Sequence, residues 1–151
     1  MPATPASHDV WLVAHDLSTL GDRAAAEAAR LAAPVGARLV LLHLHEVPNR
    51  NPYERTGNET FEMEESIRHK LGALADRLIG QHPGLRIDIE VLAGNARERV
   101  LEEAERLDAT HIVVGTSDRK GIARLVLGSV AESIVHAARI PVMVVRGAPA
   151  A

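Results

Sequence analysis

Residues 111–133 read "HIVVGTSDRKGIARLVLGSVAES", and the order of features within them indicates how this part of the chain folds. An apolar run typical of a buried strand leads into a loop that contains Gly115, Gly121 and Gly128. A helix is expected from Ser129, and the unpaired N–H groups at such a helix N-terminus bind anions. The stretch therefore predicts a strand, an anion-binding loop and a helix. An ordinary loop, in which the glycines serve turns and Ser129 only caps the helix, explains the spacing equally well.

Elsewhere in the chain, apolar residues recur with two spacings, one typical of strands and one of helices. Short apolar segments predict strands at residues 10–14, 37–44, 85–92, 111–115 and 141–145. Longer segments predict helices at about residues 19–33, 59–81, 96–107 and 129–138. Strands that alternate with helices form a parallel, doubly wound sheet. We therefore expect one Rossmann-like α/β domain over residues 9–147, with helices on both faces of an open sheet and flexible tails at 1–8 and 148–151.

The composition of the 151 residues excludes several classes of function. A formal net charge of −3, with only one Phe, one Trp and one Tyr, removes the basic surface and the aromatic residues that nucleic-acid binding uses. No apolar run is long enough to cross a membrane, and the first residues, MPATPASHD, lack the apolar core of a signal peptide. The absence of cysteine excludes disulfides and thiolate metal sites. We expect a soluble cytoplasmic protein that binds neither nucleic acid nor membranes.

Familiar catalytic motifs are missing from the sequence. It contains no Walker sequence and no G-x-G-x-x-G after the first strand, and GTSDR at residues 115–119 lacks the last glycine of a nucleophile elbow. His43 and His45 share one face of the second predicted strand, but no third ligand follows at a metal-binding spacing. We interpret both histidines as hydrogen-bonded side chains near a strand end, and we name no catalytic residue.

The sequence resembles the universal stress protein family over nearly its whole length. The pattern of that family is glycine, two residues, glycine, nine residues, then glycine followed by serine or threonine, and Gly115, Gly128 and Ser129 match it. The segment LGSVAESIVHAARIPVMVV is close to the usual ending of the family, and VLAGNARERVLEEA, AHDLS and LLHLHE are similar to three further segments. The resemblance implies a five-stranded parallel sheet in the order 3-2-1-4-5, which periodicity alone does not predict.

The resemblance also implies where ATP or another adenine nucleotide, such as AMP or ADP, would bind. In ATP-binding members the acid after the first strand contacts ribose, here Asp16, and backbone at the end of the second strand contacts adenine, here Leu44. The glycine loop and its serine hold the phosphates. The implied contact residues are Ala14, His15, Asp16, Leu44, Gly115, Thr116, Asp118, Gly128, Ser129 and Val130. In this strand order Asp16 and Gly115 meet at the switch point between strands one and four, where ligands of such sheets bind.

One position departs from the family pattern. Asp118 stands where the family has its second glycine, and Asp is among the few residues that tolerate a positive φ. A carboxylate about 5 Å from a phosphate repels it by roughly 1 kcal/mol even in water. We therefore expect AMP or ADP to bind at least as well as ATP without divalent metal, and Mg²⁺ coordinated by Asp118 to improve ATP binding.

The last predicted strand indicates how two copies of the chain would associate. A short apolar strand at a sheet edge must be paired or covered, and the resemblance implies a homodimer through Val142, Met143, Val144 and Val145. We expect a dimeric adenine-nucleotide-binding module for stress response or regulation. A nucleotide-independent dimeric interaction or scaffold protein is the alternative. A slow ATPase or nucleotidyl-transferring enzyme ranks last, because no general base or nucleophile is visible.

Overall fold

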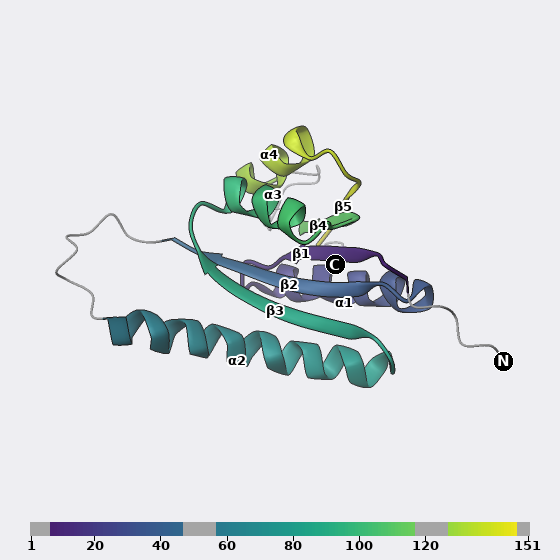
Figure 1. The fold of residues 1–151 in the computed structure, drawn as a ribbon, viewed down its shortest axis with the longest axis horizontal. Helices are drawn as coiled ribbons and strands as arrows, with labels where there is room; N and C mark the ends of the chain where they lie inside the picture. Colours follow the sequence, from purple (N-terminus) through teal and green to yellow (C-terminus); the bar gives the residue numbers. More distant parts are fainter. Residues whose placement is uncertain (1–6, 47–56, 117–126, 148–151) are drawn as a thin grey trace.

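A computed structural model of the chain describes residues 7–46, 57–116 and 127–147, which form a five-stranded sheet with helices around it (Figure 1). The strands are β1 (Val10–Ala14), β2 (Arg38–His45), β3 (Arg86–Ala93), β4 (His111–Gly115) and β5 (Val142–Val145). They pair in parallel in the order β3-β2-β1-β4-β5. The structure thereby confirms the predicted fold class and strand order. Residues 1–6 and 148–151, in the expected tails, lie outside the described residues.

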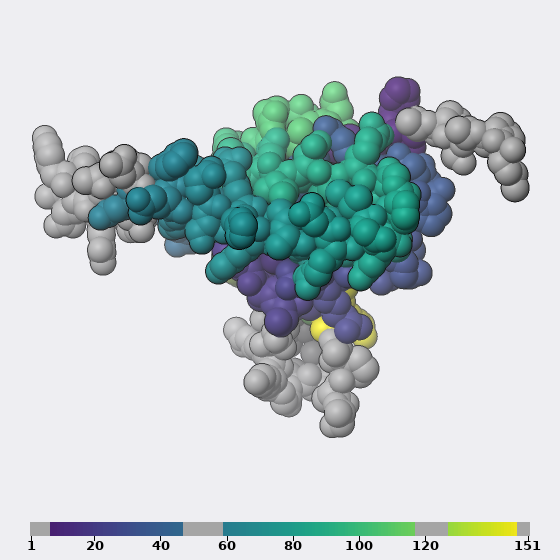
Figure 2. Space-filling model, turned by 90° about the horizontal axis from the view of Figure 1, so that it is seen from below, coloured from purple at the N-terminus to yellow at the C-terminus, as the bar shows by residue number. Residues whose placement is uncertain are grey.

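Helices cover both faces of the sheet (Figure 1). They are α1 (Thr19–Ala32), α2 (Gly57–Gln81), α3 (Ala96–Arg106) and α4 (Ser129–Ala137). Alternate residues of β1 point to opposite faces, so that Val13 is buried on the side of α1 and α2 and Leu12 on the side of α3 and α4. Figure 2 shows α2, in teal, lying across one of these faces. Within the described ranges, no helix has the length and apolar character needed to cross a membrane.

Helix α1 packs closely on the sheet because its buried face consists mostly of alanine. Its N-cap is Ser18, whose side chain accepts a hydrogen bond from the Gly21 N–H at 3.1 Å. The buried alanines of this helix are Ala24, Ala25, Ala28, Ala29 and Ala32. A short 3-10 turn (Ala33–Val35) follows, and Gly36 ends it with a φ of 69° in the left-handed region.

One helix start and one helix cap differ from the sequence prediction. Helix α2 begins at Gly57, slightly before the expected start near residue 59. Helix α4 begins at Ser129, as expected, but its N-cap is Gly128, and among the described residues no side chain makes a capping hydrogen bond there. The alternative in which Ser129 caps the helix is therefore wrong. The extended backbone of Gly128 already forms the boundary, and Ser129 is the first helical residue, with an exposed side chain.

Candidate functional site

The chain reverses its winding direction between β1 and β4, which are neighbours in the sheet. Helix α1 follows β1 on one face, whereas α4 follows β4 on the other face. The two connections therefore separate at the carboxyl ends of these strands, and such a switch point is where ligands of doubly wound sheets bind. A cavity of about 500 Å³ lies there, within the range of roughly 300–1,000 Å³ that is typical of small-molecule sites.

Nearly all the contact residues predicted from the sequence lie around this cavity. Those that line it are Ala14, His15, Asp16, Leu44, Gly115, Thr116, Gly128, Ser129 and Val130. They come from the ends of β1, β2 and β4 and from the start of α4. Asp118, the other predicted contact, lies outside the described residues, as do the loop cations Arg119, Lys120 and Arg124. The structure brings the described residues within reach of one ligand, and their individual contacts with a nucleotide stay predictions.

Strand β2 extends past the end of β1 and presents backbone groups to the cavity. The pairing of the two strands ends with Ala14 opposite Leu42, and the His15 N–H donates to the Leu42 carbonyl at 2.8 Å. In a parallel strand the peptide groups of alternate residues point to the same side. The N–H and C=O of Leu44 therefore point the same way as those of Leu42, into the space beyond β1, where a ligand can bind them.

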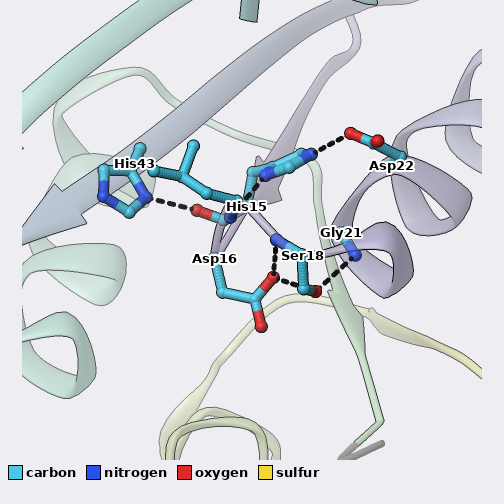
Figure 3. Close-up of polar contacts among 7 residues, drawn as sticks. His15, Asp16, Ser18, Gly21, Asp22 and His43 are labelled. Carbon is cyan, nitrogen blue, oxygen red and sulfur yellow. Dashed lines mark hydrogen bonds and ion pairs between the residues drawn. The ribbon is translucent and has the colours of Figure 1, made fainter. Parts of the chain in front are cut away.

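Asp16 holds the connection between β1 and α1 with one of its carboxylate oxygens (Figure 3). Its Oδ1 accepts hydrogen bonds from the Ser18 N–H, at 3.0 Å, and from the Ser18 hydroxyl. Burial raises the pKa of Asp16, but the hydrogen bonds from Ser18 outweigh it, and the pKa is lowered from its usual value. Oδ2 has no hydrogen-bond partner among the described residues. An ionised oxygen at the cavity is therefore left to accept hydrogen bonds from a ligand.

A buried histidine fixes the same connection in one shape (Figure 3). The Nδ1 of His15 accepts from the Leu17 N–H at 2.8 Å, so its Nε2 carries the proton and donates to Asp22 Oδ1, also at 2.8 Å. Leu17 has a φ of 68°, a left-handed conformation that costs a non-glycine residue roughly 1–2 kcal/mol. The bond to His15 helps to hold Leu17 in that conformation, and Asp16 is held with it.

Two glycines allow α1 to approach the strand ends. A Cβ at Gly21 would lie 2.8 Å from His15 Cε1 and 2.9 Å from Asp16 Oδ1, and a Cβ at Gly115 would lie 3.0 Å from Leu20 Cγ. Gly115, the first glycine of the family pattern, thus also lets Leu20 of α1 pack closely against the end of β4. Sequence reasoning missed Gly21, although a glycine in the first turn of an alanine-rich helix was a signal for such a close contact.

Both histidines of β2 are hydrogen bonded, as the sequence predicts. His43 Nδ1 donates to the His15 carbonyl oxygen at 2.7 Å, and His45 Nε2 contacts Glu64 Oε1 at 2.8 Å. Burial lowers the pKa of His43, although the hydrogen bond to the His15 carbonyl opposes this shift. His43 also lines the cavity, which the sequence did not reveal. In the parts of the chain that the structure describes, no group of three or more His, Asp or Glu side chains could hold a metal ion.

The start of α4 contributes backbone donors to the cavity. Gly128, Ser129 and Val130 line it, and the N-cap glycine has no side chain that could bond to the first N–H groups of the helix. N–H groups at a helix start and the positive end of the helix dipole favour an anion. The hydroxyl of Ser129 is a further possible donor.

These features define the class of the molecule, an α/β protein with a ligand cavity at the switch point of a doubly wound sheet. The chain belongs to the universal stress protein family, whose model matches residues 10–146. It is 34% identical over 139 residues to the universal stress protein in the QAH/OAS sulfhydrylase 3′ region of Thermus aquaticus, covering 89% of this chain and 96% of that protein. It is 33% identical over 129 residues to universal stress protein G of Salmonella typhimurium, covering 84% and 89%.

Other curated relatives match over shorter segments. The chain spans 37% of the length of a universal stress protein of Methanocaldococcus jannaschii, at 41% identity over 63 residues. It spans 36% of the length of the stress response protein NhaX of Bacillus subtilis, at 37% identity over 59 residues.

Solved structures of the family share this fold. The universal stress protein UspA of Lactobacillus plantarum matches with a TM-score of 0.75 at 20% identity, over 93% of this chain and 99% of that chain. A universal stress protein in complex with cAMP matches with a TM-score of 0.67 at 22% identity, over 91% and 95%. One from Archaeoglobus fulgidus in complex with dAMP matches with a TM-score of 0.60 at 20% identity, over 92% and 98%. At these identities the likeness establishes the fold.

Proposed function

We propose that this chain is a homodimeric adenine-nucleotide-binding module that acts in stress response or regulation, as a sensor or partner-binding protein. The observation that carries the proposal is a single cavity that offers apolar surface for a base, a carboxylate for a sugar and a helix N-terminus for a phosphate. Two solved relatives of the same fold, in complex with cAMP and with dAMP, support an adenine nucleotide as the ligand.

The base would occupy the β2 side of the cavity. Leu42 of β2 and Ala96 and Val100 of α3 supply apolar surface there, and a flat base buried against it leaves water favourably. The outward peptide groups of Leu44 can pair with the edge of adenine, the carbonyl accepting from the amino group and the N–H donating to N1. This arrangement requires no charged side chain.

The sugar and the phosphates would follow toward α4. Asp16 would accept hydrogen bonds from the ribose hydroxyls through its Oδ2, and the N–H groups that follow Gly128 would bind a phosphate together with Ser129. A carboxylate and a phosphate repel each other. A sugar placed between them keeps the two negative charges apart, which favours this order of the three groups over its reverse.

Calorimetric titration with AMP, ADP and ATP, with and without Mg²⁺, tests the proposal. We expect saturable binding of at least one of the three nucleotides to the purified protein. If the folded protein binds none of them, the nucleotide-binding proposal is wrong and the nucleotide-independent scaffold is favoured. Steady ATP turnover above background, abolished by Ser129→Ala, would instead support the enzyme alternative.

Asp16→Asn isolates the proposed contact with ribose. The amide oxygen of Asn can still accept from Ser18, so the loop is kept, whereas its amide nitrogen cannot accept from a sugar hydroxyl. We expect AMP affinity to fall roughly tenfold or more while the melting temperature stays nearly unchanged. Asp88→Asn, at a position paired with Arg38 and away from the cavity lining, is the control and should bind AMP normally. Wild-type affinity in Asp16→Asn would contradict the assignment.

A further inference from the structure

We propose that Asp22 is a positioning residue for the carboxylate of Asp16, and that it acts through the buried ring of His15 only while that ring is neutral. This inference rests on the proposed function, because it assumes that Asp16 contacts a bound nucleotide. It assigns a role in binding to a residue of α1 that lies outside the cavity lining.

The first step concerns the turn that holds Asp16. Its Oδ1 accepts from the Ser18 N–H at 3.0 Å, so the carboxylate is bonded across Leu17 to the residue that follows it. The backbone conformation of Leu17 therefore decides whether the Ser18 N–H reaches this oxygen. Leu17 has a φ of 68°, which is disfavoured for a residue with a side chain. The turn thus depends on a further contact that holds Leu17 in this conformation.

The second step concerns the ring that makes this contact. His15 Nδ1 accepts from the Leu17 N–H at 2.8 Å, which requires a lone pair on Nδ1. A neutral imidazole carries one proton, and the bond made by one nitrogen decides which nitrogen holds it. Asp22 Oδ1 lies 2.8 Å from Nε2 (Figure 3), and an ionised carboxylate only accepts. Asp22 therefore keeps the proton on Nε2 and leaves Nδ1 free to accept from Leu17.

The third step concerns the two changes that would break this arrangement. Without Asp22 the proton can move to Nδ1, where it would face the Leu17 N–H, one donor against another. Protonation of the ring has the same effect, because it preserves the bond to Asp22 but places a second proton on Nδ1. Only 2% of the His15 side chain is exposed, so the ring cannot turn toward water without moving its neighbours. Since the charge of histidine changes at about pH 5–8, we expect the turn to loosen as the pH falls.

The other titratable groups around the ring do not account for such a change. In the described part of the chain, the groups that face it are Asp22 of α1, Asp16 of the connection after β1 and His43 of β2. Burial raises the pKa of Asp16, but the hydrogen bonds from Ser18 outweigh it and the net shift is downward. Asp16 is therefore still ionised at pH 5.5. Burial lowers the pKa of His43, which delays its protonation to lower pH.

Asp22→Ala removes the group that fixes the proton on Nε2. Calorimetric titration with AMP at pH 7.5 should show binding about fivefold weaker than in the wild type, the size expected for the loss of one hydrogen bond, with the fold kept as judged by circular dichroism. Glu27→Ala is the matched control. Glu27 lies on the same helix, accepts from Arg30 and does not line the cavity, so this variant should bind AMP like the wild type.

His15→Asn tests whether Asp22 acts through the ring. The amide oxygen of Asn can take the place of Nδ1 and accept from the Leu17 N–H, a bond to the second following residue that Asn often makes in turns. It does not titrate and has no atom in the place of Nε2. We expect this variant to bind AMP within about threefold of the wild type at pH 7.5. Adding Asp22→Ala to it should then change nothing, whereas independent effects would add.

Lowering the pH supplies a readout that a merely structural contact would not change. The phosphate of AMP also titrates in this range, so the wild type is compared with His15→Asn at the same pH, where the contribution of the ligand cancels. The ratio of the two affinities should fall about fivefold between pH 7.5 and pH 5.5, because only the wild type has a ring at position 15 that gains a proton. A constant ratio would contradict the requirement for a neutral ring.

Nitrogen NMR of the imidazole rings tests the mechanism without any ligand, because it distinguishes a protonated ring nitrogen from one with a lone pair. In the free wild-type protein at pH 7.5, the His15 proton should be on Nε2. In Asp22→Ala a larger share of it should be on Nδ1. A wild-type ring with its proton on Nδ1 would overturn the inference and would not concern nucleotide binding.

The binding experiments also separate this inference from the proposed function. Unchanged AMP affinity in Asp22→Ala, or additive effects of Asp22→Ala and His15→Asn, would show that Asp22 does not position Asp16 through the ring. Both results leave AMP binding to the wild type, and with it the proposed function, intact. Failure of the folded wild-type protein to bind AMP would overturn the inference, and failure to bind any of the three nucleotides would overturn the proposed function as well.

Discussion

At Gly21, one added methyl group would clash with two residues that line the cavity, His15 and Asp16. Its Cβ would lie under 3.0 Å from His15 and Asp16, and the His15 ring is buried and bonded at both nitrogens. Alanine is favoured over glycine in helices by about 1 kcal/mol, but overpacking of this kind costs about 1–3 kcal/mol. We expect Gly21→Ala to lower the melting temperature by roughly 2–6 °C and to weaken AMP binding.

Gly80→Ala is the matched control for Gly21→Ala. Gly80 is also helical, but a Cβ there would meet nothing within 4 Å, so only the gain in helix propensity applies. Thermal unfolding followed by circular dichroism should show an unchanged or higher melting temperature for this variant. If Gly21→Ala were as stable as Gly80→Ala and bound AMP normally, the close contact of α1 with the loop would not restrict the site.

Asp118 is a residue whose effect we predict from its place in the loop motif, since it lies outside the described residues. Removing its charge should strengthen metal-free ATP binding by roughly 1 kcal/mol, or about fivefold, in Asp118→Gly. Asp118→Asn should show most of the same gain if charge is the cause. Equal metal-free ATP affinities of all three proteins, measured by calorimetry, would contradict the repulsion. A gain only in Asp118→Gly would point to backbone conformation instead.

Among the elements, β5 is the one through which we expect the molecule to pair with a second copy. It is an edge strand of the sheet, and the carbonyls of Pro141 and Val145 accept hydrogen bonds from Ile112 of β4 and from Thr116, which follows β4. By alternation, the peptide groups of Val144 point to the free edge. We expect a dimer paired along this edge, and Val144→Pro should abolish it, since proline removes an outward N–H without breaking a bond to β4.

Val144→Thr is the control for this strand, because it keeps the branched shape and the outward N–H. Sedimentation or light scattering at micromolar concentration should show a dimer for the wild type and for Val144→Thr, and mostly monomer for Val144→Pro, with all three folded by circular dichroism. A monomeric wild type would refute dimerisation at this concentration. A fully dimeric Val144→Pro would show that the dimer interface does not use the free edge of β5.

For the whole molecule, the position of the site follows from the reversal of the winding direction between β1 and β4. The spacing of apolar residues predicted the strands and helices well, because this spacing involves only residues that are close together in the sequence. The strand order could not be obtained in this way, since several orders satisfy the same parallel connections; it came from the family resemblance. That order places Asp16 and Gly115 at one cavity. The predicted strand order therefore also located these two residues of the site.

The sequence alone determined the α/β class, the placement of the elements and the residues at the strand ends, because caps, glycines and apolar spacing act over a few neighbouring positions. Only the tertiary structure decided which side chains meet at those ends. The bond of His43 to the His15 carbonyl depends on β2 extending beyond β1, and the need for glycine at position 21 depends on how closely the alanine face of α1 packs on the sheet. The glycine within the alanine-rich helix signals a close contact, but which residues it meets, and at what distance, depends on how separate elements pack.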